Sequence, residues 1–210
     1  MPRSYALSDE ARAGRQAQKQ ATRDALLQAA QALFVKKGFD NTSVTEIGKA
    51  AGVSHTLINT YFGGKAGLLA AVVQTTNAPQ LLATQELAKG EADPVAQLRS
   101  MLLAWATHDL ADRRLIAVLH ATSWSWDAQS EATNRAERDA FFAILADVIA
   151  RARRSGLAQG HVAPADVAEA IFAIYTWGIR QALFLAIAPD AAIARIWPQI
   201  QAAAGLPPEA

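Results

Sequence analysis

The stretch from residue 43 to residue 65, SVTEIGKAAGVSHTLINTYFGGK, holds start and stop signals for two short helices with almost no spare residues between them. Ser43 and Glu46 have the spacing of a capping box, in which the hydroxyl and the carboxylate each accept an otherwise unpaired backbone N–H. This spacing predicts a helix that begins at about Val44. Gly52 stands where a helix ends in the left-handed conformation, which glycine adopts at little cost. The first helix is therefore short, and the chain turns sharply after it.

A second helix, running through HTLINTYF, is expected directly after this turn. Ser54 is placed to cap it, while Ile58 and Phe62 are four residues apart and would face inward together. Two helices joined by so tight a turn predict a helix-turn-helix. The major groove of DNA admits a helix and offers donors and acceptors to short polar side chains. The outer face of the second helix supplies four such side chains, namely His55, Thr56, Asn59 and Thr60.

The order GFDNTSVTEIGKAAGVS followed by TYFGGK resembles the TetR family of one-component transcriptional repressors. The resemblance covers the first 70 residues or so, and its matching positions are Gly38, Phe39, Thr42, Val44, Ile47, Ala50, Ala51, Gly52, Val53, Ser54, Ile58, Tyr61, Phe62 and Lys65. It implies phosphate contacts from Tyr61 and Lys65. Leu57 and Asn59 stand where the family usually has Thr and Tyr, so those two backbone contacts are not carried over. The expected DNA-binding set is Thr45, Ser54, His55, Thr56, Asn59, Thr60, Tyr61 and Lys65.

Charge is divided unevenly along the chain. Residues 1–65 hold nine Lys or Arg against five Asp or Glu, a net charge of +4, and residues 66–210 hold eleven against fourteen, a net charge of −3. This asymmetry favours an N-terminal module that faces DNA and a body with another role. The chain has no cysteine, and its first 20 residues contain no apolar run of the signal-peptide kind. We therefore expect a cytoplasmic protein.

Apolar residues recur at helical spacing along most of the chain, and no strand pattern occurs, so we predict an all-α fold of about nine helices. Pro79 should bend or break one helix, while Asp93, Asp112 and Ser130 should start others. A run from 167 to 188 is long enough to span a bilayer, but its charged and amide side chains favour a buried helix and no membrane contact. The expected segments are a flexible basic arm (1–20), a three-helix helix-turn-helix DNA-binding domain (21–65), a connector helix (66–90), a ligand-binding and dimerisation domain (91–205) and a tail (206–210).

Nothing in the sequence indicates catalysis or a bound metal. The histidines, His55, His108, His120 and His161, have no partner at metal-binding spacing, and neither a nucleophile elbow nor a phosphate-binding loop occurs. We expect neither an enzyme nor a cofactor.

The body of the chain is rich in large aromatic residues on four of its expected helices. Taken one at a time, such residues are more often core than ligand contacts. Together they can converge on a pocket in which a few polar groups orient a ligand, and the family resemblance implies a variable effector pocket in this part of the chain. For a small apolar or aromatic effector, the candidate contacts are Trp105, His108, Trp124, Phe141, Tyr175, Trp177 and Arg180.

A single DNA-reading helix contacts too few bases to select one site in a genome. We therefore expect a homodimer that binds a palindromic operator. The last two helices offer apolar stripes that could form a four-helix bundle with a second copy, although both stripes could instead close their own domain. The candidate interface residues are Ile171, Ile174, Gly178, Ala182, Leu185, Ile193, Ile196, Trp197 and Ile200. The resulting hypothesis is a ligand-responsive transcriptional repressor. The alternative is an all-α protein-protein interaction module without DNA binding.

Overall fold

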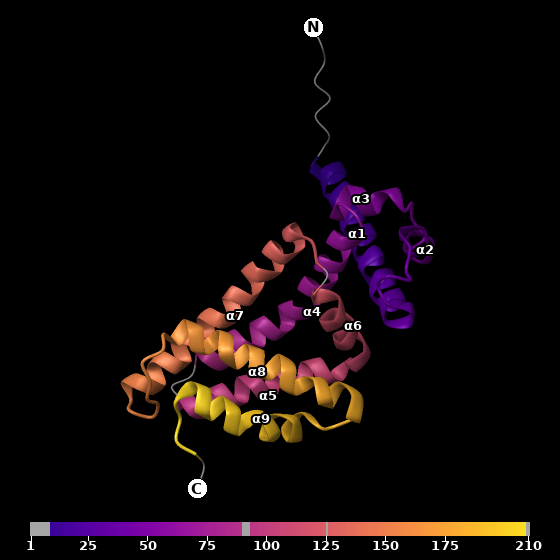
Figure 1. Ribbon diagram of the computed structural model, residues 1–210. Coiled ribbons are helices and arrows are strands. Elements are labelled where there is room, and N and C mark those ends of the chain that lie inside the picture. The colour runs from indigo at the N-terminus through magenta and orange to yellow at the C-terminus, as the bar shows by residue number, and fades with distance from the viewer. Residues whose placement is uncertain (1–8, 90–92, 125, 209–210) are drawn as a thin grey trace. The chain divides into compact units, whose positions relative to one another are not determined.

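The computed structural model describes residues 9–89, 93–124 and 126–208. Over these ranges the chain forms nine α-helices and no strand, so the predicted all-α fold is confirmed (Figure 1). Contacts divide the chain into two compact units, Met1–Val72 and Val73–Ala210. The first boundary therefore falls inside the fourth helix, later than the predicted end of the DNA-binding domain at residue 65. None of the described helices is both long and apolar enough to cross a membrane.

The first unit contains α1 (Asp9–Lys37), α2 (Val44–Ala50), α3 (Thr56–Phe62) and the first turns of α4 (Lys65–Ala88). α2 packs against both α1 and α3. The core of this unit is formed by fully buried apolar side chains, including Leu26, Phe34, Ile47 and Ile58. Three helices around one core are the arrangement that a helix-turn-helix domain requires, because neither short helix can bury its apolar face alone.

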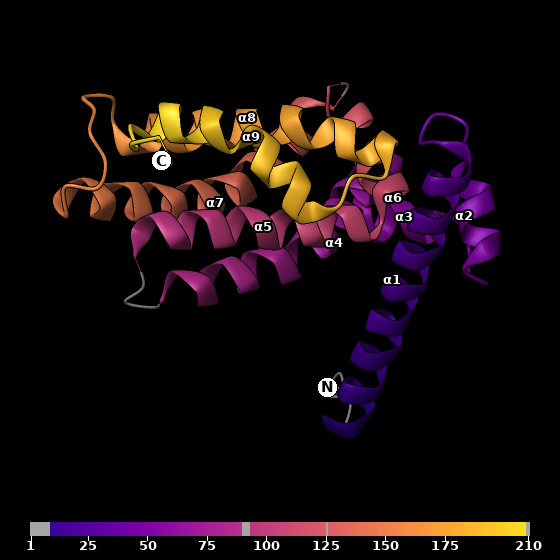
Figure 2. The same cartoon turned by 90° about the horizontal axis from the view of Figure 1, so that it is seen from below.

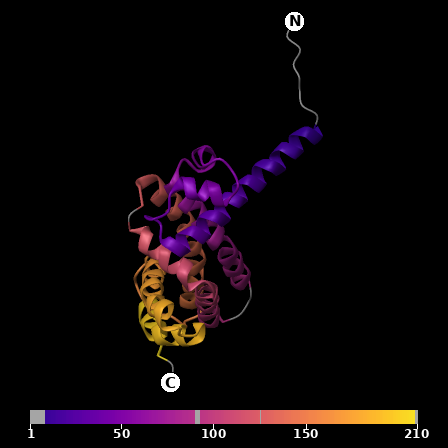
Figure 3. The same cartoon turned by 90° about the vertical axis from the view of Figure 1, so that its right-hand side faces the viewer.

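α1 begins at Asp9, so the predicted flexible arm is wrong for residues 9–20, and residues 1–8 lie outside the described ranges. Figures 2 and 3 show the first turns of α1 projecting clear of α2 and α3. This part of the helix is exposed almost all round and has no apolar face to recognise. Its alanines, glutamines and arginines are good helix formers by intrinsic propensity, and this is the signal that an argument from apolar periodicity misses.

The second unit contains the rest of α4 and five further helices: α5 (Pro94–Ala111), α6 (Arg113–Ser123), α7 (Ala128–Arg154), α8 (Pro164–Leu185) and α9 (Pro189–Ala204). α8 packs between α7 and α9, and α5 contacts both α7 and α9 (Figures 1 and 2). The core is formed largely by the inner faces of α5, α7, α8 and α9, with Trp105, Leu145, Ile171 and Ile200 almost completely buried.

Three helices of the second unit, α5, α6 and α7, start at aspartate caps. The carboxylates of Asp93 and Asp112 accept the backbone N–H groups of Ala96 and Leu115, each at 3.0 Å, as predicted. α7 starts at Ala128 rather than at Ser130, because Asp127 caps it by accepting the N–H of Ser130 at 2.7 Å. An aspartate ahead of a serine was therefore the better cap signal.

Three predicted boundaries change. α4 continues through Pro79 to Ala88, so the proline does not break it, and the expected end at Gly90 lies outside the described residues. α8 ends at Leu185 rather than near residue 188. The predicted tail is anchored at its start, because Leu206 is buried and its N–H donates to the carbonyl of Gln201 at 2.9 Å.

Candidate DNA-binding surface and ligand cavity

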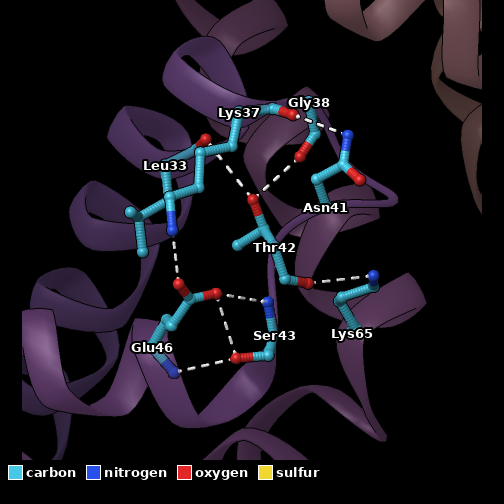
Figure 4. Close-up of polar contacts among 8 residues, drawn as sticks. All are labelled: Leu33, Lys37, Gly38, Asn41, Thr42, Ser43, Glu46 and Lys65. Atoms are coloured by element: carbon cyan, nitrogen blue, oxygen red, sulfur yellow. Dashed lines mark hydrogen bonds and ion pairs between the residues drawn. The ribbon is translucent and has the colours of Figure 1, made fainter.

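The junction between α1 and α2 is held by a connected set of polar side chains (Figure 4). The buried Thr42 hydroxyl donates to the carbonyl of Gly38 at 2.8 Å, and the predicted capping box between Ser43 and Glu46 is present. Lys37, at the end of α1, pairs with the Glu46 carboxylate. The lysine hydrogen bond and then the Ser43 donors lower the pKa of Glu46 from 4.5 to about 2. The carboxylate therefore stays ionised and ties α1 to α2 at neutral pH.

Lys65 ties the start of α4 to the same junction. Its ammonium donates to the carbonyl oxygens of Phe39, at 2.9 Å, and Thr42, at 3.0 Å, and it lies 4.3 Å from the centroid of the Phe39 ring. An ammonium has three N–H donors, so two internal bonds leave one for another acceptor. Lys65 thus has a structural role that its spacing in the sequence did not indicate.

α2 and α3 approach each other closely at Gly48. A Cβ atom placed there would lie 2.8 Å from the backbone N and Cα of His55. Gly52, with φ of 69°, makes the predicted left-handed turn between the two helices. α3 begins at Thr56, and the hydroxyl of Ser54 accepts the Thr56 N–H at 3.3 Å and lies 2.8 Å from the Thr56 hydroxyl. The turn therefore places α3 tightly against α2 and leaves little freedom in its direction.

Most of the predicted DNA-facing residues are accessible in the first unit. Thr45 on α2 is exposed, as are Ser54 and the four residues chosen for the outer face of α3, whereas Tyr61 and Lys65 are half-buried. Ile58 is fully buried beneath them. An exposed row of hydroxyl, imidazole and amide groups on a firmly seated helix is suited to reading base edges.

Basic side chains of α1 extend this surface, and two of them, Arg15 and Lys19, fall in the segment predicted to be a flexible arm. Arg15, Lys19 and Arg23 are spaced by four residues and so share one face of α1. The Lys19 ammonium lies 5.9 Å from the centroid of the Tyr61 ring, and the Arg23 guanidinium lies 5.2 Å from that of Phe62. These contacts place positive charge beside the end of α3, which itself carries no basic residue. The spacing of four was the signal that could have found them.

The second unit encloses a cavity of about 160 Å³. Its walls come from five helices and from the segment before α7. The apolar and aromatic part is formed by Val73, Trp105, Ile116, Leu119, Trp126, Phe141, Phe172 and Tyr175, and the polar part by Asn77, Gln80, Asp109, His120, Ser123, Asn134, Arg138 and Thr176. Trp105 is the centre of the aromatic cluster, with the rings of Phe141 and Tyr175 edge-on to it at 5.3 and 5.4 Å.

A buried carboxylate, Asp109, organises the polar part of this cavity. It accepts the Tyr175 hydroxyl at 2.6 Å and the Gln80 amide at 3.1 Å. Burial, followed by the charge of Asp109, raises the pKa of Tyr175 well above 10, so the phenol stays protonated and acts as a donor. Burial also lowers the pKa of His120, against the opposing effect of Asp109, and this favours a neutral imidazole.

Two lining atoms have no hydrogen-bond partner among the described residues: Trp126 Nε1 and Asn134 Oδ1. Asn134 is only 3% exposed, and its amide nitrogen donates to the carbonyl of Ser130 at 2.8 Å. That bond fixes the orientation of the amide, because a carbonyl oxygen cannot donate to another carbonyl. A buried polar atom without a partner is costly, so the cavity has an unmet demand for one acceptor and one donor.

Three of the seven predicted ligand contacts line the cavity, namely Trp105, Phe141 and Tyr175, and the other four do not. His108 lies beside Asp109 but outside the lining, with Nδ1 3.4 Å from Oδ1. Trp124 caps the end of α6 and is 94% exposed. Trp177 and Arg180 lie on the outer face of α8. Helical spacing placed these side chains on the correct helices but could not say which face meets the cavity.

Trp177 and Arg180 instead belong to an exposed apolar groove between α8 and α9. Trp177 is 76% exposed, Phe184 66% and Leu185 65%, and the groove continues over Arg195 and Gln199 of α9. We call this surface the α8–α9 face. Contiguous large apolar side chains of this kind are characteristic of surfaces that another molecule covers.

Most of the predicted interface residues cannot form that surface, because their own chain covers them. Six are no more than 3% exposed: Ile171, Ala182, Ile193, Ile196, Trp197 and Ile200. Gly178 is packed directly against Ile196. Ile174 is half-buried, and only Leu185 is largely exposed. The apolar stripes of α8 and α9 therefore close the unit itself, as the alternative reading of those stripes held. Of the predicted interface residues, only Gly178, Leu185 and Ile196 also line the α8–α9 face.

The geometry of the first unit, a firmly seated short helix with an exposed polar face, is that of a helix-turn-helix DNA-binding protein. Residues 26–72 match the family model for bacterial regulatory proteins of the tetR family. "Probable HTH-type transcriptional regulator YttP" of Bacillus subtilis is 47% identical over 51 residues, which cover 24% of this chain and a quarter of that protein. The HTH-type transcriptional regulator TtgR of Pseudomonas putida is 28% identical over 173 residues, covering 79% of this chain and 82% of that protein.

Solved structures show the same fold over most of the chain. NalD of Pseudomonas aeruginosa, described as the secondary repressor of the MexAB-OprM multidrug efflux pump, superposes with a TM-score of 0.68 at 22% identity, over 88% of this chain and 97% of that one. At this identity the likeness concerns the fold alone. The family model and the curated relatives carry the identification, and the chain belongs to the TetR family of transcriptional regulators.

Proposed function

We propose that this protein is a ligand-responsive repressor that binds a palindromic operator as a homodimer in the cytoplasm and leaves it when a small molecule occupies the cavity of the second unit. The observation that carries the proposal is the exposed polar row of α3, which the capping box, the Gly48 contact and Lys65 hold in a fixed direction. Such a row reads bases only if its direction is fixed.

On the DNA side, base reading and phosphate contact come from different residues. Asn59 and Thr60, on the outer face of α3, would set base preference, while Lys19 and Arg15 of α1 would contact phosphates flanking the site. In vitro selection from random DNA with the full-length protein should return a palindrome with half-sites one helical turn or a multiple apart, roughly 34 Å per turn. Enrichment of no sequence would contradict the proposal and favour the protein-protein interaction module.

Variants separate the two kinds of contact. Lys19→Ala should weaken binding to all sequences alike and reduce the salt dependence by about one phosphate. Asn59→Ala should instead change the ranking of operator variants, with discrimination lost by about 1–3 kcal/mol at one position. Glu10→Ala, also on the exposed part of α1, is the matched control for Lys19→Ala. An unchanged ranking in Asn59→Ala would remove Asn59 from the base-reading residues.

The homodimer would form through the α8–α9 face. Trp177, Phe184 and Leu185 supply the apolar contacts, and the Arg180 guanidinium lies 5.5 Å from the Phe184 ring centroid, where it can become part of a rim. Trp177→Glu places a charge in the seam without disturbing the core of the unit, because the side chain is exposed. Sedimentation should then show a folded monomer with weak operator binding. Leu82→Glu, at another exposed apolar residue, is the control that should remain dimeric.

Release from DNA would follow from thermodynamic linkage. A ligand that favours a spacing of the two DNA-binding units unsuited to the operator lowers the affinity for DNA, and DNA lowers the affinity for that ligand by the same factor. α4 connects the two units, and its residues Val73, Asn77 and Gln80 line the cavity. A movement of these residues on ligand binding would therefore be passed to the DNA-binding unit along one helix. An effector of the cavity should therefore both quench tryptophan emission and lower operator affinity.

A further inference from the structure

The cavity of the second unit carries enough detail to indicate what kind of molecule fits it. We propose that its ligand is a one-ring aromatic compound, uncharged or cationic, that carries a group able both to donate and to accept a hydrogen bond, such as a phenolic hydroxyl, and that carboxylic acids are excluded. This inference rests on the proposed effector site and names the chemistry of its occupant.

The size and the walls of the cavity indicate the ring. About 160 Å³ is close to the volume of an engineered apolar cavity of 150 Å³ that binds benzene, so a single ring with short substituents fills it. Trp105, Phe141 and Phe172 present aromatic surfaces, and their mutual edge-on orientations leave ring edges and faces for another aromatic group. A long acyl chain or a fused multi-ring compound would need more room than the cavity holds.

The unpaired atoms indicate the polar group. Trp126 Nε1 needs an acceptor, and Asn134 Oδ1 needs a donor. A hydroxyl suits either demand, because its oxygen accepts while its hydrogen is donated. A plain hydrocarbon of the same size would leave both atoms unpaired. A ligand that pairs one of them should bind about tenfold more tightly.

The charges indicate which ligands are refused. Arg138 is the one Lys or Arg among the described residues that line the cavity, and it is already paired with Glu131 of its own helix. Asp109 is 7% exposed, and its closest donors, Tyr175 and Gln80, are neutral, while the imidazole of His108 approaches it only to 3.4 Å. A ligand carboxylate would add a second buried negative charge without a free cation, whereas an ammonium would gain from Asp109.

Four probes with one ring test these statements by calorimetry on the full-length protein without DNA: 4-ethylphenol, ethylbenzene, tyramine and 4-hydroxyphenylacetate. The phenol should bind about tenfold more tightly than the hydrocarbon. Tyramine should exceed 4-hydroxyphenylacetate, its anionic counterpart, by at least about tenfold. Ethylbenzene binding as tightly as 4-ethylphenol, 4-hydroxyphenylacetate binding as tightly as tyramine, or no binding by any of the four would each overturn the proposal.

Variants locate the interactions. Trp126→Phe removes the indole N–H and keeps an aromatic ring, and Asn134→Leu removes the amide oxygen and keeps the branching at Cγ. Each should erase most of the preference for 4-ethylphenol over ethylbenzene. Trp124→Phe, at a tryptophan that is almost fully exposed, is the control and should leave the preference intact. Asp109→Asn should narrow the gap between tyramine and 4-hydroxyphenylacetate. If Asn134→Leu does not fold, Trp126→Phe alone tests the proposal. An unchanged preference of Trp126→Phe for 4-ethylphenol over ethylbenzene would contradict the proposed contact with the ligand's polar group.

The DNA-binding experiments test the repressor function independently of the ligand-binding experiments. The predicted ranking of probes together with a failure to select any operator would leave the ligand assignment standing and remove the repressor function. Operator binding that is released only by a carboxylic acid would do the reverse.

Discussion

The two units treat their buried polar groups in opposite ways. Among the described residues of the first unit, no buried side-chain nitrogen or oxygen lacks a hydrogen-bond partner, and Thr42, Ser43, Glu46 and Lys65 form one connected junction. In the second unit, Trp126 and Asn134 leave polar atoms unpaired at the wall of a cavity. The first unit is complete by itself and presents a fixed surface. The second is incomplete by itself, as a site that awaits a ligand must be.

This difference means that the same kind of substitution should have different effects in the two units. A change that disturbs the junction of the first unit removes interactions that are already made, so it should cost stability. A change at the unpaired atoms of the second unit removes a polar atom that has no hydrogen-bond partner in the free protein. It should therefore weaken ligand binding without lowering stability.

The largest effect is expected from Gly48→Ala in the first unit. The new methyl group would lie 2.8 Å from the backbone of His55, which cannot move without moving α3, so we expect a loss of about 3 kcal/mol. Hydrogen exchange at the amides of α2 and α3 measures this loss separately from the second unit. Gly14→Ala is the matched control, because that helical glycine has open space around it and should gain up to about 1 kcal/mol. Equal effects of the two changes would mean that the contact between α2 and α3 is loose.

Thr84→Val tests what one more unpaired buried donor costs the second unit. The indole N–H of Trp105 donates to the Thr84 hydroxyl at 2.7 Å, and both groups are buried. Removing the hydroxyl at constant shape should cost about 2 kcal/mol in the free energy of unfolding measured with urea. Thr107→Val, at an exposed threonine of α5, should change stability by less than about 0.5 kcal/mol. A cost no larger than that of the control would show that an unpaired donor is not costly in this unit. The unpaired N–H of Trp126 would then give no reason to expect a ligand with a hydrogen-bond acceptor.

The structure of the first unit is largely predictable from its sequence, because local signals decide it. The capping box at Ser43, the turn at Gly52 and the buried Ile58 are local signals, and each was read correctly because caps and left-handed glycines are decided within a few residues. The helical start of α1 was missed, because its exposed residues have no apolar pattern. Local signals also found most helices of the second unit.

The cavity could be predicted only in part. Periodicity placed Trp105, Phe141 and Tyr175 on helices, but the face that each helix turns to its neighbours depends on packing across the whole unit. For this reason Trp177 was expected at the ligand and lies on the α8–α9 face instead. Asn134 and Gln80 were not singled out at all, since a lone amide on a helix reads as an ordinary surface residue until burial is known.

Asn134→Leu should raise the stability of the free protein slightly while weakening the binding of 4-ethylphenol. The substitution removes an unpaired buried oxygen and keeps the branching at Cγ, and the gain should be about 1 kcal/mol after the loss of the bond to the Ser130 carbonyl. The urea midpoint measures it. Gln129→Leu, at an exposed position in the first turn of α7, is the control and should be neutral. A clear destabilisation by Asn134→Leu would mean that its oxygen is satisfied in solution, and the two units would then not differ as described.

The smallest effect is the pH response of the α1–α2 junction. The pKa of Glu46 is lowered from 4.5 to about 2, chiefly by its hydrogen bond with Lys37. A carboxyl whose pKa is depressed by folding stabilises the folded state fully above its unfolded pKa and loses that contribution as the pH falls through the folded value. The window is therefore pH 4.5 to 2. The pair is exposed to solvent, so the loss should be modest and salt-dependent. Titration of the Glu46 side chain by NMR should give a midpoint near 2, and Lys37→Met should move it up toward 4.5. A midpoint near 4.5 in the unaltered protein would show that the Lys37 pairing does not persist in solution, and the junction would then depend on Thr42 and Lys65 alone.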